Sequence, residues 1–312
     1  MNAPSQPHYE QTIREQALKL GFSFCGIAAN ESLDFRLPFY TEFLKRDGQA
    51  DLTYLKTQFE NRFHPDRVME GTQSVVAVLM NYFPEKTLVR ENNFIISKHT
   101  YGRDYHVVMR ERITRLTGFM KELFGEIRLK SFIDSGPVLE KLWAQRCGLG
   151  WQGKNTILIN PTAGSFFFIG IIFTDRKLQP DTPETDHCGN CMKCVRACPN
   201  GALNTPYQLD IARCISYLNI ETNGASIPAQ LKNGLNNRIY GCDICQDVCP
   251  YNKSAAPTRI EDFHLSEELQ QMRKKDWISL TENQFKRLFT GSSIERIGYQ
   301  RFMINIRRLE TI

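Results

Sequence analysis

The sequence has no long apolar run. No uninterrupted apolar stretch approaches the roughly 20 residues that cross a bilayer, and the richest one, residues 165–174, has only the length of a strand. The N-terminal residues MNAPSQPHYEQ also lack the basic segment followed by an apolar segment that is typical of a signal peptide. We therefore expect a cytoplasmic protein without a membrane span.

Glycine and proline are scarce as well, with 20 and 14 of 312 residues, whereas 41% of the residues are hydrophobic. This composition excludes collagen, low-complexity chains and intrinsic disorder. The length is enough for one large or two medium domains that each bury a core. The formal net charge of +5 is small, so it permits an anionic partner without demonstrating one.

Cysteine is the residue type that stands out. A cytosolic chain with 10 cysteines uses them as metal ligands or redox groups rather than in disulfides. Two of them, Cys25 and Cys147, stand apart and are expected to be small buried side chains. The other eight form a run C-x2-C-x2-C-x3-C-P, a single cysteine and a run C-x2-C-x3-C-P: Cys188, Cys191, Cys194, Cys198, Cys214, Cys242, Cys245 and Cys249.

The first run has the spacing of bacterial ferredoxins, in which three cysteines hold one [4Fe–4S] cluster and the fourth holds the other. This crossover rule gives the first cluster Cys188, Cys191, Cys194 and Cys249, and the second cluster Cys198, Cys214, Cys242 and Cys245. Cys214 completes the shorter second run from an expected helix over residues 209–219. Two structural zinc sites are the alternative, although a three-cysteine run followed by Cys-Pro fits zinc poorly.

The first 175 residues alternate between helical and extended patterns, which predicts an α/β or α+β domain with a mixed sheet. The clearest helix is expected over residues 104–124, where apolar residues recur at steps of three and four before Gly125. Further helices are expected over residues 11–20 and 138–147, and strands over residues 22–28, 74–83, 127–133, 156–159 and 165–174.

A polar, proline-bearing segment at residues 175–186 marks a domain boundary. We therefore divide the chain into three parts: an α/β domain (1–175), a ferredoxin-like double-cluster domain (176–252) and a helical tail (253–312). In the tail, Thr281 and Gln284 have the spacing of a helix capping box.

A glycine-rich segment, GLGWQGKN at residues 148–155, matches two nucleotide-binding patterns. The G-x-G-x-x-G pattern requires a strand before it and a helix after it, whereas here a helix precedes and a strand follows. The phosphate-loop pattern fails because Asn155 stands where a Ser or Thr would hold Mg²⁺. What remains is a turn in which bare backbone closely approaches another group.

Several segments together resemble the epoxyqueuosine reductases, cobalamin-dependent iron–sulfur enzymes of tRNA modification that are related to reductive dehalogenases. They are YGRDYH at residues 101–106, DSG at 134–136, the glycine-rich segment, the cysteine pattern and RIYGCD at 238–243. The resemblance implies that the chain reduces epoxyqueuosine to queuosine at the wobble position of tRNA anticodons. It also implies cob(I)alamin recharged through the two [4Fe–4S] clusters, and a carboxylic acid that protonates the departing oxygen.

The resemblance implies the site residues too. Asp134 is the expected proton donor, because desolvation by corrin and substrate favours a neutral carboxyl group. Tyr105 is the expected hydrogen-bond donor to the substrate or an intermediate. His106, beside a helix cap, is expected to be simply hydrogen-bonded. The sequence lacks D-x-H-x-x-G, so cobalamin is expected base-off, without a protein histidine ligand. The implied cobalamin contacts are Arg62, Ser97, Asp134, Lys154, Asn155, Thr156, Leu158, Ser165 and Ile169.

The expected partners are tRNA carrying epoxyqueuosine and an electron donor of unknown identity, with the chain itself a monomer. The candidate tRNA contacts are Lys141, Arg146 and Arg238. We expect a splayed anticodon base to be read by an aromatic pocket. The chain ends inside an expected amphipathic helix, RFMINIRRL, and many relatives continue into helical repeats, so a truncated C-terminus stays open.

Two other functions stay open at this point. A reductive dehalogenase-like corrinoid reductase would act on a small substrate and would usually carry an export signal, which the sequence lacks. A ferredoxin-type electron carrier would not need the first 175 residues.

Overall fold

A four-stranded sheet forms the centre of the larger lobe in the computed structural model, which describes residues 9–45, 53–222 and 227–310. The strand order is β1-β2-β7-β4. Their bounds are β1 (Phe24–Ala29), β2 (Ser74–Asn81), β7 (Phe167–Thr174) and β4 (Leu129–Phe132). The first seven residues of β2, SVVAVLM, are all buried, which explains why this strand is continuously apolar rather than alternating.

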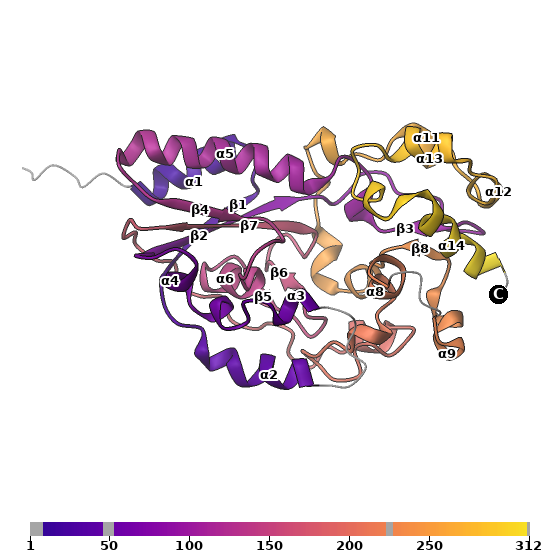
Figure 1. The fold of residues 1–312 in the computed structure, drawn as a ribbon, viewed down its shortest axis with the longest axis horizontal. Helices are drawn as coiled ribbons and strands as arrows, with labels where there is room; N and C mark the ends of the chain where they lie inside the picture. The colour runs from indigo at the N-terminus through magenta and orange to yellow at the C-terminus, as the bar shows by residue number, and fades with distance from the viewer. Residues whose placement is uncertain (1–8, 46–52, 223–226, 311–312) are drawn as a thin grey trace, which may run out of the picture.

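Helices cover both faces of this sheet (Figure 1). One face carries α1 (Tyr9–Lys19) and α5 (Tyr105–Phe124), and the other carries α2 (Leu37–Lys45), α4 (Pro65–Val68) and α6 (Glu140–Arg146). Successive residues of β2 enter two separate cores, because side chains alternate across a strand. Val76, Val78 and Met80 pack under α1 and α5, whereas Val75, Ala77 and Leu79 pack against α6.

The predicted long helix is confirmed as α5. Asp104 is its N-cap, with a carboxylate oxygen that accepts from the His106 amide at 2.9 Å. Gly125 ends it with φ +73°, a conformation that glycine adopts without strain. His106 bonds Asp104 through its ring Nδ1 at 2.7 Å, so the expectation of a hydrogen-bonded histidine is confirmed.

The α/β class is confirmed, but the predicted mixed sheet is not what the main sheet shows. The pairings β1–β2, β2–β7 and β4–β7 are all antiparallel. Parallel pairing occurs apart from it, between β3 (Ile95–Ile96) and β8 (Arg238–Tyr240). The prediction failed because an alternation of helices and strands does not fix strand direction: a helical connection can also return the chain antiparallel.

The smaller lobe combines segments that are distant in the sequence. Its core packs buried residues of the stretch from Leu88 to Tyr101 against the C-terminal helices. The first 175 residues therefore do not lie in one lobe alone. The helices of this lobe are α8 (Ile215–Ile220), α9 (Ala229–Lys232), α11 (Glu267–Gln271), α12 (Lys274–Ile278), α13 (Glu282–Phe289) and α14 (Gly298–Glu310). The helical tail is thus confirmed, and Thr281 and Gln284 form the predicted capping box of α13.

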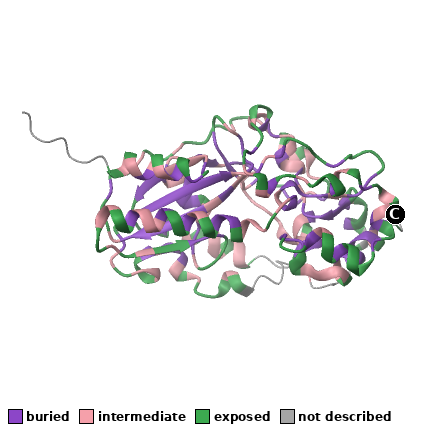
Figure 2. Cartoon of the chain, turned by 90° about the horizontal axis from the view of Figure 1, so that it is seen from above, coloured by how far each residue is buried: buried purple, intermediate pink, exposed green. Residues whose placement is uncertain are grey.

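Short elements complete the chain: α3 (Thr53–Lys56), α7 (Lys193–Ala197), α10 (Ile244–Asp247) and the paired strands β5 (Trp151–Gln152) and β6 (Leu158–Ile159). Figure 2 shows the buried strands of the main sheet enclosed by helices whose outer faces are exposed. In the described ranges, none of the helices is both long and apolar enough to cross a bilayer.

The helix predicted over residues 209–219 is confirmed only in its second half, as α8, and is interrupted at Cys214. A 3-10 helix (Ile211–Arg213) ends there, Cys214 has extended backbone with φ −68° and ψ 125°, and α8 begins at the next residue. Cys214 is therefore the N-cap of α8, and the backbone amides of Ser216 and Tyr217 act to lower the pKa of its thiol against the larger opposing effect of burial. Apolar periodicity does not reveal this break, because it reports the buried face of a helix and not a change of backbone conformation at one residue.

Candidate active site

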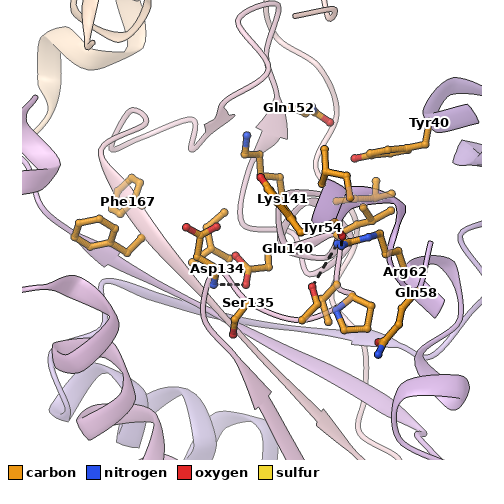
Figure 3. Close-up of a pocket in the computed structure, with 18 of the residues that line it drawn as sticks. Tyr40, Tyr54, Gln58, Arg62, Asp134, Ser135, Glu140, Lys141, Gln152 and Phe167 are labelled. Atoms are coloured by element: carbon orange, nitrogen blue, oxygen red, sulfur yellow. Dashed lines mark hydrogen bonds between the residues drawn. The ribbon is translucent and has the colours of Figure 1, made fainter. Parts of the chain in front are cut away.

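A cavity of about 700 Å³ opens beside the carboxyl end of β4 (Figure 3). Asp134 follows β4, Glu140 and Lys141 begin α6, Tyr105 begins α5 and Phe167 begins β7. The ends of separate elements therefore converge here, although they are far apart in the sequence. The volume lies in the range of small-molecule and cofactor sites.

Asp134 and Tyr105 form the polar centre of this cavity. The Tyr105 hydroxyl donates to Asp134 Oδ2 at 2.6 Å. Tyr105 is itself held by stacking on Phe168, with ring centroids 4.2 Å apart and planes inclined by 4°. The Asp134 side chain is 68% exposed, so its carboxyl group faces the open cavity and not the protein core.

A second carboxyl group lies behind the first. Glu140 Oε1 accepts a hydrogen bond from the Asp134 backbone amide at 2.6 Å, drawn as a dashed line in Figure 3. Burial, reinforced by the negative charge of Asp134, raises the pKa of Glu140 to about 8.

The surrounding groups are also shifted toward their neutral forms. Burial is the main cause of the raised pKa of Tyr105, with Asp134 adding to it. Desolvation lowers the pKa of Lys141, against the opposing effect of Asp134 and Glu140. The pKa of His99, another lining residue, is lowered by burial. Such perturbed groups around one cavity are typical of a functional site.

Three of the predicted cobalamin contacts line this cavity: Arg62, Asp134 and Ile169. The Arg62 guanidinium is only 9% exposed and donates to the carbonyls of Tyr54 at 2.9 Å and Gly136 at 3.3 Å. Its Nε is buried without a partner in the described structure. An orphaned buried donor in the wall fits a ligand rich in acceptor groups, such as the amide side chains of a corrin.

The other six predicted contacts lie outside this lining. Leu158 belongs to the core under α6, Ser97 bonds Asp243, and Ser165 bonds Asn252. Lys154, Asn155 and Thr156 form a bridge between two regions instead. The Thr156 carbonyl accepts from the cavity-lining Lys141 at 3.1 Å, and Lys154 Nζ donates to the Cys191 carbonyl at 3.1 Å. These three residues therefore separate the cavity from the cysteines.

Cysteines from both runs surround a second, small cavity. Cys188, Cys191, Cys194 and Cys249 all line it, together with Lys154 and Asn155. The Trp151 indole donates to Cys188 Sγ at 3.4 Å. In the part of the chain that the structure describes, no three Cys, His, Asp or Glu side chains converge as ligands of a single ion. What the structure shows is that the four cysteines line one shared cavity.

The remaining four cysteines also influence one another. The charge of Cys198 acts on Cys214, that of Cys214 on Cys242 and Cys245, and that of Cys242 on Cys245. Burial raises the pKa of the Cys242 thiol to about 12. Burial also raises the pKa of the Cys214 and Cys245 thiols, and the positive charge of a metal centre would oppose this effect.

Comparison with known proteins identifies the family. Residues 62–135 match the family model described as Epoxyqueuosine reductase QueG, DUF1730, and residues 187–252 match the 4Fe-4S double cluster binding domain. An epoxyqueuosine reductase of Leadbetterella byssophila is 41% identical over 298 residues, covering 96% of this chain and 97% of the relative. The chain belongs to the epoxyqueuosine reductase family.

Other members agree with this assignment. The epoxyqueuosine reductase of Cyclobacterium marinum is 38% identical over 300 residues and covers 96% of each chain. A crystal structure of epoxyqueuosine reductase with a tRNA-Tyr epoxyqueuosine-modified tRNA stem loop superposes with a TM-score of 0.83 at 28% identity, covering 96% of this chain and 80% of that one. The predicted resemblance, fold class and assignment as an enzyme of this family are confirmed.

In this reductase the glycine-rich segment approaches its own chain. A Cβ on Gly150 would lie 2.2 Å from the Ile159 carbonyl, and one on Gly148 would lie 2.7 Å from the Thr182 carbonyl. The expectation that bare backbone approaches another group is confirmed. The segment closes the β5–β6 hairpin and packs it against residues 181–182.

The three candidate tRNA contacts have different surroundings. Lys141 lies in the wall of the large cavity. Arg146 pairs with Glu31. Arg238 is only 7% exposed and lies in β8, where its charge acts on Cys242. Of the three, Lys141 is the one with access to a ligand in the cavity.

Sequence reasoning missed several residues of the site. Glu140, His99, Tyr40 and Tyr54 line the cavity without having been predicted. Glu140 had a weak signal, since an acidic residue in the first turn of a helix six positions after Asp134 can reach back to the loop. The other three come from segments whose position relative to β4 only the folded chain decides.

Proposed function

We propose that this protein reduces epoxyqueuosine to queuosine in tRNA. The names of its full-length relatives and the tRNA stem loop in the matched crystal structure support this substrate. The observation that carries the proposal is the Tyr105–Asp134 pair, with a hydrogen bond of 2.6 Å, facing a cavity of about 700 Å³. Hydrogen bonds of Thr156 and Lys154 connect the wall of this cavity to the cysteine loops. A proton source, a ligand cavity and an electron-transfer domain are thus adjacent.

The reaction sets clear chemical demands. Converting an epoxide to an alkene takes two electrons and two protons and releases the oxygen as water. Cobalamin bound in the cavity would supply the reducing metal, with electrons from the two clusters. The chain itself must hold the cofactor, protonate the leaving oxygen and keep the reacting groups in place.

Asp134 is the proposed proton donor. Its carboxyl group faces the cavity, and a ligand that covers it would favour its neutral form by removing water. The Tyr105 hydroxyl donates its one proton to Asp134 Oδ2 and so orients this carboxyl group, and we propose that this hydrogen bond moves to the substrate when it binds. Because Tyr105 is locked against Phe168, the direction of this hydrogen bond is set before the substrate arrives.

The proposed cluster ligands are the two crossed sets of four cysteines. The convergence of Cys188, Cys191, Cys194 and Cys249 on one small cavity supports the first set, since Cys249 comes from the second run. A polynuclear cluster suits thiols spread around a space. Cys214 at the start of α8 supports the second set, because helix amides stabilise a thiolate charge.

Cobalamin is proposed to contact Arg62 and Ile169 in the cavity wall, with Arg62 Nε available to an acceptor of the corrin side chains. Base-off binding remains a prediction. His99 lines the same cavity, and its Nδ1 lies 2.8 Å from Ser97 Oγ. A splayed anticodon base is proposed to meet the aromatic rim, where Tyr54 is 59% exposed.

Anaerobic reconstitution with iron, sulfide and cobalamin, followed by assay on epoxyqueuosine-containing tRNA, tests the proposal. We expect queuosine to form with the reconstituted protein. The matched variant Asp134→Ala should retain both cofactors, seen in the visible spectrum, and lose at least about 100-fold in turnover, the usual range for general acid catalysis. Cobalamin binding without epoxide loss would contradict the function, and near-normal turnover of Asp134→Ala would remove it as proton donor.

A further inference from the structure

The backbone of Asp134 has an unusual conformation. Its φ is +48°, in the left-handed region that a non-glycine residue rarely adopts, although Asp tolerates it better than most. Asp134, Ser135 and the following Gly136 are exposed, so core packing does not impose this geometry. Specific polar contacts must therefore hold it.

One of these contacts comes from Glu140. Its Oε1 accepts from the Asp134 amide at 2.6 Å, and the Ser135 amide also interacts with its carboxyl group. The hydrogen bond acts on the backbone, at the point where the chain turns. The other contact, from the Tyr105 hydroxyl, acts on the carboxyl group of the same residue. Asp134 is thus held at both ends.

Of the two residues joined by this hydrogen bond, Glu140 and Asp134, Glu140 is the one fixed by packing. It opens α6, whose first residues are anchored by Val138, Leu139 and Leu142, all at most 8% exposed in the core under the sheet. The N-cap, Leu139, provides no side-chain hydrogen bond, so an acidic first-turn residue is favoured at this helix end. The anchored helix therefore imposes the geometry of the exposed loop, and not the reverse.

We propose that Glu140 is a positioning residue for the proton donor: its carboxyl group holds the Asp134 amide and so aims the Asp134 carboxyl group into the cavity. This inference rests on the proposed function, because only there is Asp134 the donor. Without Glu140 the Asp134 backbone relaxes toward negative φ, and its carboxyl group turns away from Tyr105. Glu140 itself does not transfer a proton in this proposal.

Hydrogen exchange of the Asp134 amide tests the contact directly, in the reconstituted protein and independently of turnover. In Glu140→Ala we expect exchange about tenfold faster, the loss expected for one hydrogen bond. Glu140→Gln keeps an acceptor oxygen, so it should stay within about threefold of the parent. Glu282→Ala, a first-turn glutamate of α13, is the matched control and should leave this amide unchanged. Unchanged exchange in Glu140→Ala would overturn the proposal.

Turnover on modified tRNA separates positioning from a general structural role. In Glu140→Ala we expect kcat to fall about tenfold with KM for tRNA within about twofold, and Glu140→Gln to recover most of the loss. On an Asp134→Asn background, Glu140→Ala should cost nothing further. An additional loss there, or a changed KM alone, would contradict the proposal. If Asp134→Ala keeps its turnover, the proposed donor fails, whereas the exchange result still decides the contact.

Discussion

Single residues in the cavity have pKa values shifted toward their neutral forms. Glu140 has a raised pKa, and those of Lys141 and His99 are lowered, each chiefly by burial or desolvation. Asp134, whose side chain is 68% exposed, lies beside these groups and is the residue proposed to supply the proton.

The raised pKa of Glu140 predicts a pH-dependent stability. The native state binds this proton more tightly than the unfolded chain, since the pKa rises from 4.5 to about 8. The stabilising contribution is thus present below about pH 4.5 and is lost as the pH rises through about 8. Glu140→Gln cannot titrate, so its Tm relative to the parent should increase between pH 5 and pH 9. Thermal melts of the parent and Glu140→Gln between pH 5 and pH 9 check this prediction, with Glu282→Gln as the control. A Tm difference between Glu140→Gln and the parent that stays constant with pH would refute it.

At the scale of elements, the glycine-rich segment shows how a tight packing contact can resemble a binding motif. Gly150 has φ +151° and lies against the Ile159 backbone of its own hairpin. The hairpin leads into Lys154 and Thr156, which connect the cavity wall to the cysteine loops. The glycines thus set the position of this connection and do not cradle a phosphate.

Gly150→Ala should therefore destabilise the protein strongly. The new Cβ would lie 2.2 Å from the Ile159 carbonyl oxygen, and the hairpin backbone must shift to relieve this overlap. We expect a loss of about 3 kcal/mol in the free energy of unfolding, the upper range for ordinary point mutations. Gly118→Ala in α5 is the control: nothing lies within 4 Å of its Cβ, so it should stabilise by up to about 1 kcal/mol. Equal Tm values for the two variants would contradict this account.

At the scale of the whole molecule, the two lobes are connected more than once. Residues 88–101 leave the α/β lobe to pack in the core of the C-terminal helices, and β3 pairs with β8 there. The two cysteine runs meet around one cavity. The cluster domain is therefore held against the cavity by several chain crossings, which suits electron transfer over a fixed distance.

Removing one crossing cysteine should empty a single cluster. In Cys249→Ser we expect iron to fall from about eight to about four atoms per chain, because the second set of thiols stays complete. Cys25→Ala, a variant of one of the two isolated cysteines, should keep all its iron. Iron and sulfide analysis with the visible spectrum measures this. Loss of all iron in Cys249→Ser, with the fold intact by circular dichroism, would contradict the crossed ligand sets.

The sequence by itself determined the local features. The spacing of the cysteines, the period of α5 with its cap at Asp104, and the capping box of α13 depend on neighbours a few residues apart, so they can be read along the chain. The family followed from short motifs of the same kind. The resemblance also names Asp134 and Tyr105 as separate site residues, but not the hydrogen bond between them.

Only the tertiary structure decided how these parts meet. The antiparallel sheet, the break at Cys214 and the entry of residues 88–101 into the second core depend on contacts between distant segments. The same holds for Glu140, whose significance lies in one hydrogen bond to a strained backbone. Local periodicity shows which side of a helix or strand is buried. Long-range packing determines which other element that side contacts. The sequence can therefore identify individual site residues, whereas their arrangement into one site depends on the contacts between distant segments.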